Sequence, residues 1–153
     1  MLAKTHAAIG LLTATLLFPF MNISWFILFP FIILGSVIPD IDHKGSTINN
    51  FFPITKVFSF LFVHRGFFHS IFPVFLFLIA EIIFKLKGIG LCIAIGYSSH
   101  LFCDALTPLG IKFFHPLTDF HVKGFVPTGG FVESIIFISV SLLAFSKIFG
   151  FIF

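Results

Sequence analysis

The sequence predicts an all-α protein, a polytopic membrane helical bundle of about five apolar helices. Two observations support this prediction. Of the 153 residues, 58% are hydrophobic and only 10% are charged, which is far from the composition of soluble domains. The apolar residues also fall into five segments, separated by polar or Pro- and Gly-rich stretches. We expect residues 1–153 to form a single membrane-embedded domain.

The five expected helices differ in length. The first two, residues 6–18 and 24–38, are shorter than the roughly 20 residues that a membrane crossing needs. They therefore cross at a tilt, thin the bilayer locally, or form a partial hairpin. The other three cover residues 67–85, 88–107 and 131–149. No small-x-small cleavage pattern follows the first segment, so we interpret it as a membrane helix and not as a signal peptide.

The two long connections have different character. The stretch from residue 40 to 66 contains one apolar piece, residues 57–63, which is too short to cross a membrane and is expected to lie along the interface. The stretch from residue 107 to 130 is rich in Pro and Gly, which is typical of a loop.

Ionisable side chains are rare here and gather at the ends of the expected helices. Such groups are costly within hydrocarbon unless they are paired or near water, so their positions are informative. In an alternating up-and-down path, all of these helix ends lie at one membrane face, which predicts a shared site with polar loops around it. The residues are His6, Asp40, Asp42, His43, His64, Arg65, His69, His100, Asp104 and Glu133.

Two pairs of these residues have the chemistry of metal ligands. His100 and Asp104 are four positions apart, so they share one helical face and are able to grip one cation. A structural hydrogen bond is the alternative. Asp40 and Asp42 follow Pro39 at a helix end and provide oxygen ligands suited to zinc or manganese. A solvated loop at the end of the helix is the alternative for this pair.

The segment that precedes the third helix indicates an anion. His64, Arg65 and His69 lie together there, and Arg binds phosphate in a bidentate manner. Contact with lipid headgroups would explain the same residues. Glu133 is a metal ligand, a general base or an orienting carboxylate, or it complements the dipole of its helix. His6 is an extra ligand or an interfacial side chain.

Other features restrict the function. The net charge of +3 comes without a basic cluster, so no direct nucleic-acid binding is expected. Cys92 and Cys103 are too far apart on one helix for a disulfide. His115, Asp119 and His121 lie in the second long loop and are weaker candidates for the site.

Three ordered motifs carry a resemblance to a known family. They are Pro39-Asp40-Ile41-Asp42-His43, then His64-Arg65-Gly66-x-x-His69-Ser70, then Ser99-His100-x-x-x-Asp104-x-x-x-Pro108-x-Gly110 followed by His115-Pro116. The pattern resembles the YdjM-type family of LexA-binding, inner-membrane-associated, metal-dependent hydrolases. It covers nearly the whole chain, and is distantly similar to the zinc-dependent phospholipase C and P1 nuclease group.

The resemblance implies a metal-dependent hydrolase domain in a bacterial-type inner membrane, in contact with membrane lipids and with a LexA-like protein partner. We expect hydrolysis of a phosphoester, such as a lipid-linked phosphate, with water activated by zinc or manganese. Arg65 would stabilise negative charge and Glu133 would move the proton. The expected metal ligands are His6, Asp40, Asp42, His64, His69, His100 and Asp104.

Two other classes of function stay open from the sequence. One is a membrane-tethered interaction protein with a structural metal site. The other is a metal or proton transporter, which the apolar middles of the later helices disfavour. Lys and Arg are more numerous on the site face, which predicts a cytoplasmic site in a multi-pass topology. The cations on the site face are Lys4, Lys44, Lys56, Arg65, Lys112 and Lys123, and those on the other face are Lys85, Lys87 and Lys147.

Overall fold

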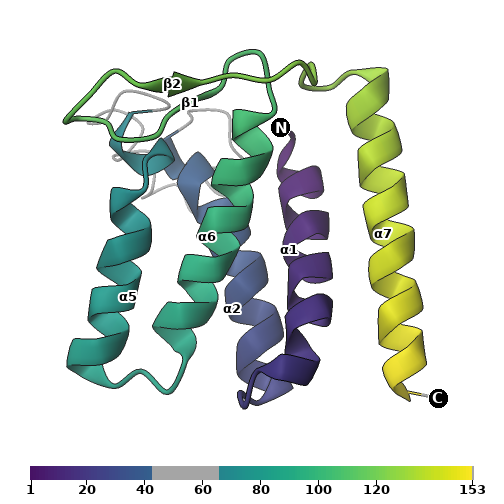
Figure 1. The fold of residues 1–153 in the computed structure, drawn as a ribbon. Helices are drawn as coiled ribbons and strands as arrows, with labels where there is room; N and C mark the ends of the chain where they lie inside the picture. Colours follow the sequence, from purple (N-terminus) through teal and green to yellow (C-terminus); the bar gives the residue numbers. More distant parts are fainter. Residues whose placement is uncertain (43–65, 153) are drawn as a thin grey trace.

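The chain is mostly helical. A computed structural model describes residues 1–42 and 66–152 (Figure 1). Within these residues, the α-helices are α1 (Ala3–Leu17), α2 (Trp25–Val37), α5 (Phe72–Phe84), α6 (Ile89–Ala105) and α7 (Phe131–Ile152). Short 3₁₀ turns are η1 (Phe18–Phe20), η2 (Ile38–Asp42) and η4 (Phe67–His69). Each expected apolar segment is therefore a helix.

The largest shift from the expected boundaries is at α5, which begins at Phe72 and not near residue 67. The segment Phe67–His69 forms the separate turn η4, and Pro73 lies in the first turn of α5. A proline fits the first turn of a helix, where its missing N–H is not needed. As a result, His69 lies in a tight turn ahead of the helix.

Only one helix in the described ranges is both long enough and apolar enough to cross a membrane by itself. This helix is α7, with a candidate span of 21 residues, Phe131–Phe151. The other apolar helices, α2, α5 and α6, are shorter than a usual span. Large apolar side chains on α5 and α7 are exposed, including Ile82 and Phe145. Exposed apolar surface of this extent is typical of a membrane-facing or protein-binding surface.

Helix α6 lies at the centre of the bundle and packs against α1, α2 and α5, whereas α7 packs mainly on α1 (Figure 1). The approach of α2 to α6 is very close. A Cβ added at Gly96 would lie 2.0 Å from the carbonyl oxygen of Ile32, and one at Gly35 would lie 2.3 Å from that of Ile93. Glycine is therefore required at both positions, as is common where helices pack closely in membranes.

The connection between α6 and α7 is a loop, as expected, but it also holds a small hairpin. Strand β1 (Ile111–Lys112) pairs in antiparallel fashion with β2 (His121–Val122). The hairpin lies over one end of the bundle, near the N-terminus, the start of α5 and the end of α6 (Figure 1). The C-terminus lies at the opposite end. The hairpin end is the face on which the sequence analysis placed the site.

Candidate metal centre

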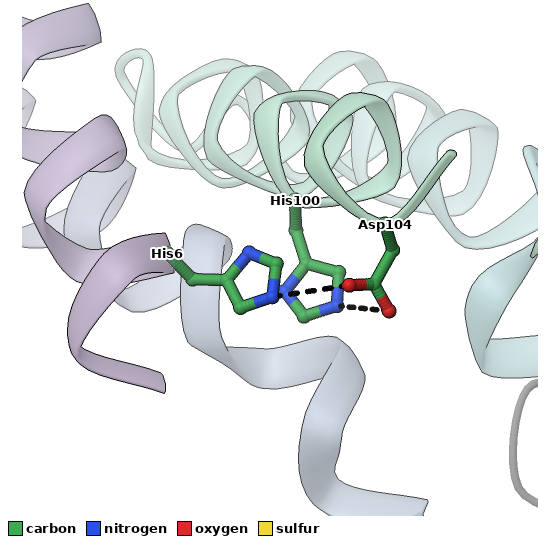
Figure 2. A group of neighbouring side chains, drawn as sticks. All are labelled: His6, His100 and Asp104. Carbon is green, nitrogen blue, oxygen red and sulfur yellow. Dashed lines mark ion pairs between the residues drawn. The ribbon is translucent and has the colours of Figure 1, made fainter. Parts of the chain in front are cut away.

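The centre of the site is the pair His100 and Asp104 on α6. Both side chains are buried, and His100 Nε2 lies 3.8 Å from Asp104 Oδ2. The spacing of four residues places them one above the other on one helical face. Figure 2 shows both side chains directed to the same side of α6. The predicted juxtaposition is present, in a position where few other polar groups are available.

Two more residues from separate turns reach the same point. His69 in η4 places its Nε2 3.4 Å from His100 Nε2 and 3.5 Å from Asp104 Oδ2. Asp40 in η2 places its Oδ1 3.9 Å from His69 Nε2 and 3.8 Å from His100 Nε2. Residues from three parts of the sequence thus converge, because η2 and η4 pack together beside the end of α6.

These spacings fit a small divalent cation. Zinc bonds to nitrogen and oxygen of about 2.0–2.2 Å give a tetrahedral site with edges of about 3.3–3.6 Å between ligand atoms. The five separations given for His69 Nε2, His100 Nε2, Asp40 Oδ1 and Asp104 Oδ2 run from 3.4 to 3.9 Å. Two imidazole nitrogens and two carboxylate oxygens are also a normal donor set for zinc.

The imidazole of His100 is oriented by the main chain. Its Nδ1 lies 2.8 Å from the carbonyl oxygen of Ser36, at the end of α2. A carbonyl only accepts, so Nδ1 carries the proton and donates it, and Nε2 keeps its lone pair toward the other three residues. A metal-binding histidine commonly has such a second hydrogen bond, which fixes its tautomer.

His6 lies on the other side of Asp104. Its Nε2 is 3.3 Å from Asp104 Oδ1, and its ring stacks on His100 with centroids 3.7 Å apart (Figure 2). His6 is fully buried, and neither ring nitrogen has a hydrogen bond of normal geometry within the described residues. The amino group of Met1 also donates to Asp104 Oδ1. Oδ1 of Asp104 therefore contacts His6 and Met1, whereas Oδ2 faces His69 and His100.

Burial raises the pKa of the Asp40 carboxyl above its ordinary value, and the imidazoles of His6 and His69 oppose this rise. Asp40 lies in η2, beyond the end of α2, and 16% of its side chain is exposed, against 0–2% for His69, His100 and Asp104. Of these four residues, Asp40 is thus the one that solvent or a ligand reaches most easily.

Glu133 lies apart from this group. Its two carboxylate oxygens each accept one backbone N–H at 2.6 Å, from Leu2 and from Gly129. The first of these bonds fixes Leu2, and the carbonyl oxygen of Leu2 accepts the backbone N–H of His6. Glu133 therefore fixes the start of α1 relative to the start of α7.

The remaining expected residues are not part of the described cluster. His43, His64 and Arg65, and the side chain of Asp42, lie outside the described part of the chain. In the hairpin connection, Asp119 accepts a hydrogen bond from Lys112, and His121 bonds the carbonyl oxygen of Leu109. The described potential ligand groups are His6, His100 and Asp104, and Asp40, His69 and His100.

One contributor escaped the sequence analysis, namely the Ser36 carbonyl. A signal for it exists in the sequence, because the last turn of a helix leaves carbonyl groups without helical partners, and Pro39 cannot donate an N–H to any of them. Any of several carbonyls before Pro39 would have met this criterion, so the pattern does not single out Ser36.

The chain was compared with known proteins. It matches the YdjM inner membrane protein family over residues 1–152. It is 38% identical over 112 residues to the uncharacterized protein YvsG of Bacillus subtilis, a match that covers 71% of this chain and 70% of YvsG. It is 35% identical over 104 residues to the inner membrane protein YdjM of Escherichia coli and of Shigella flexneri, covering 60% of this chain and half of each YdjM protein.

No solved structure has significant similarity to the chain. The resemblance inferred from the three motifs is confirmed, because the family match includes all of them and nearly every residue of the sequence. The chain belongs to the YdjM inner membrane protein family.

Proposed function

We propose that this chain is a multi-pass inner membrane hydrolase that cleaves a phosphoester with the help of one bound divalent ion, zinc or manganese. The observation that supports the proposal best is the convergence of ligand atoms from three separate segments, since the Nε2 atoms of His69 and His100 lie 3.4–3.9 Å from each other and from a carboxylate oxygen of both Asp40 and Asp104. The fixed tautomer of His100 supports it further, since the lone pair of Nε2 faces the other three atoms. Such an arrangement has a high desolvation cost unless it binds something.

We assign His69, His100 and Asp104 as the residues that hold the ion. Their side chains are 0–2% exposed, and their ligand atoms lie 3.4–3.8 Å apart. Asp40 Oδ1 faces the fourth position, and it is the only one of the four with appreciable exposure. Catalytic zinc sites keep one such position for water or substrate. The bound ion would activate water near neutral pH and polarise a phosphoryl oxygen.

In this scheme the protein residues have distinct tasks. Asp40 Oδ1 would accept the proton of the attacking water and return it to the leaving oxygen, because Asp40 is the most exposed of the four residues. His6 and the Met1 amino group contact the outer oxygen of Asp104. Glu133 positions the start of α1 through its two backbone hydrogen bonds. Arg65, outside the described residues, keeps its expected role with phosphate.

The membrane arrangement that we propose has all the apolar helices within the bilayer. Helices α2, α5 and α6 are short, so they cross as a packed group beside the longer α7 where the bilayer is locally thinned. The excess of Lys and Arg on the site face supports a site on the cytoplasmic side. The LexA-like partner stays a prediction from the family resemblance.

The test separates a catalytic ion from a structural one. Wild type, Asp40→Asn and Asp104→Asn would be purified in mild detergent, and bound metal and hydrolysis of a soluble phosphomonoester and of phosphatidic acid would be measured. We expect Asp104→Asn to lose both metal and activity, and Asp40→Asn to keep metal and lose activity. Wild type that binds metal but hydrolyses no phosphoester would favour an interaction protein with a structural ion. Wild type without metal, even after reconstitution, would refute the proposal.

A further inference from the structure

A second feature lies directly beside the metal centre. An apolar groove of about 320 Å³ runs between α5, α6 and the turns η2 and η4. Its lining exposes almost no polar surface, and its volume is within the range of small ligand sites. The groove is open along one side, where α5 also exposes Leu76.

Three elements provide residues to both the groove and the metal centre. Phe68, Ile38 and Tyr97 line the groove, and they lie one, two and three positions before His69, Asp40 and His100, respectively. Tyr97 donates a hydrogen bond to the carbonyl oxygen of Phe68, so η4 is fixed against α6 at this point. Because α6 ends at the site, Tyr97 lies about one turn deeper in the bundle than His100.

The groove extends along α5 away from the site. Pro73, Leu76, Phe77 and Ala80 line it at helical spacing, and seven residues of helix correspond to a rise of about 10 Å. Among the described elements, α5 packs mainly on α6 and η4, and its outer face leaves Phe75, Ile79 and Ile83 exposed. In a membrane protein the material at such a face is lipid.

We propose that this groove binds an acyl chain of a membrane lipid whose phosphate lies at the metal centre. The inference rests on the proposed function and defines its substrate class as a lipid phosphoester, not a soluble one. An apolar groove on a lipid-facing helix, beside a cluster of imidazoles and carboxylates, matches a molecule with a long chain and a phosphate head. A soluble phosphoester would leave the groove empty.

The probe is a phosphonate analogue of phosphatidic acid with a photoreactive diazirine in its acyl chain, which a hydrolase does not cleave. It would be added to the zinc-loaded full chain in nanodiscs, and the labelled residues would be mapped by mass spectrometry. We expect labelling of the groove residues of α5 and η4. Ala80→Trp fills the groove and should reduce this labelling several-fold, whereas Ile79→Trp, at the exposed neighbouring position, should not.

Two controls connect the chain to the phosphate. A diacylglycerol with the same diazirine chain should label the groove weakly, and Asp104→Asn should reduce labelling by the phosphonate lipid. Equal labelling by both probes, or labelling spread evenly over the exposed faces of α5 and α7, would overturn the inference. Hydrolysis of a soluble phosphoester without groove labelling would leave the proposed function intact and refute the lipid substrate. Metal-dependent groove labelling without hydrolysis of any phosphoester would support lipid binding at the groove and refute the proposed hydrolase activity.

Discussion

The two ends of the bundle each contain a carboxylate on an apolar helix, and the two carboxylates have very different partners. At the hairpin end, Asp104 is surrounded by the imidazoles of His6, His69 and His100. At the other end, Glu81 on α5 accepts the backbone N–H groups of Gly88 and Gly90, each at 2.8 Å. Both carboxylates are satisfied, but only the first is satisfied by groups that also bind metals.

The difference shows how to interpret a rare acidic residue in a membrane protein. Glu81 is bound by the turn that follows its own helix and by the start of α6, where a negative charge complements the helix dipole. Its role is thus to close the turn between α5 and α6. Asp104 instead contacts residues that are distant in sequence, so it does not close a turn. Glu133 resembles Glu81, since backbone amides occupy both of its oxygens.

The largest expected effect comes from truncating the two carboxylates in parallel. Asp104→Ala should abolish zinc binding, because it removes the ligand that both sides of the cluster share. Glu81→Ala should leave zinc content unchanged and lower stability by about 1–3 kcal/mol, because two amides lose their acceptor. Elemental analysis and thermal unfolding in detergent measure the two effects. Equal zinc content in both variants would show that the two ends do not differ as we infer.

Acid should weaken metal binding strongly, because zinc requires neutral imidazoles and ionised carboxylates. The increase in melting temperature produced by zinc should therefore shrink as the pH falls from about 8 to about 5. Asp40 acts in the same direction. Burial raises the pKa of Asp40, so the folded metal-free chain holds the carboxyl proton more tightly than the unfolded chain does. The protonated carboxyl therefore stabilises the metal-free fold in acid, and this contribution is lost as the pH rises.

A zinc-induced melting shift that is constant over this pH range would contradict a site built from histidines. The melting shift is a better observable than zinc content. Zinc that binds the folded and the unfolded chain with equal affinity adds to the zinc content but does not change the melting temperature. Glu81→Gln is a suitable background variant for the same titration, since it lies at the end without imidazoles.

A moderate effect is expected from the α2–α6 contact. Gly96→Ala places a Cβ 2.0 Å from the Ile32 carbonyl oxygen and 2.8 Å from the Ser36 nitrogen, so the two helices must separate. Overpacking of this kind costs about 1–3 kcal/mol. It should also weaken zinc binding, because the Ser36 carbonyl orients His100. Gly150→Ala on α7 is the control, since nothing lies within 4 Å of its added Cβ. A stable Gly96→Ala protein with unchanged zinc affinity would remove Ser36 from the site.

The helices and the convergence of His6, Asp40, His69, His100 and Asp104 could be predicted from the sequence. Long apolar segments give the helices, and the desolvation cost of ionisable groups restricts these groups to helix ends. The five crossings predicted with them are not shown, because α2, α5 and α6 are shorter than a usual span and only α7 meets the length of one. Apolar character indicates that a segment avoids water, but does not determine whether it crosses the membrane.

The backbone partners of Glu81 and Glu133 could not be predicted. Every residue except proline carries a backbone N–H, so nothing in the sequence distinguishes the amides of Leu2, Gly88 and Gly129 as the groups that bind them. The hairpin β1–β2 also escaped prediction, because each strand has only two residues and leaves no alternating pattern. Interactions through the backbone were missed, whereas those between rare side chains were found.

The smallest effect distinguishes two of the roles that the sequence left open for Glu133, the general base and the orienting carboxylate. Glutamine at this position retains one acceptor for the Leu2 or the Gly129 amide, so Glu133→Gln should reduce phosphoester hydrolysis only slightly and leave zinc content unchanged. A general base contributes about 10²–10⁴-fold, and its loss would be evident in kcat. Hydrolysis should be compared with that of Asp40→Asn under the same conditions. A loss in Glu133→Gln as large as that in Asp40→Asn would move the proton acceptor to Glu133, and would place a carboxylate bound by backbone amides among the catalytic groups.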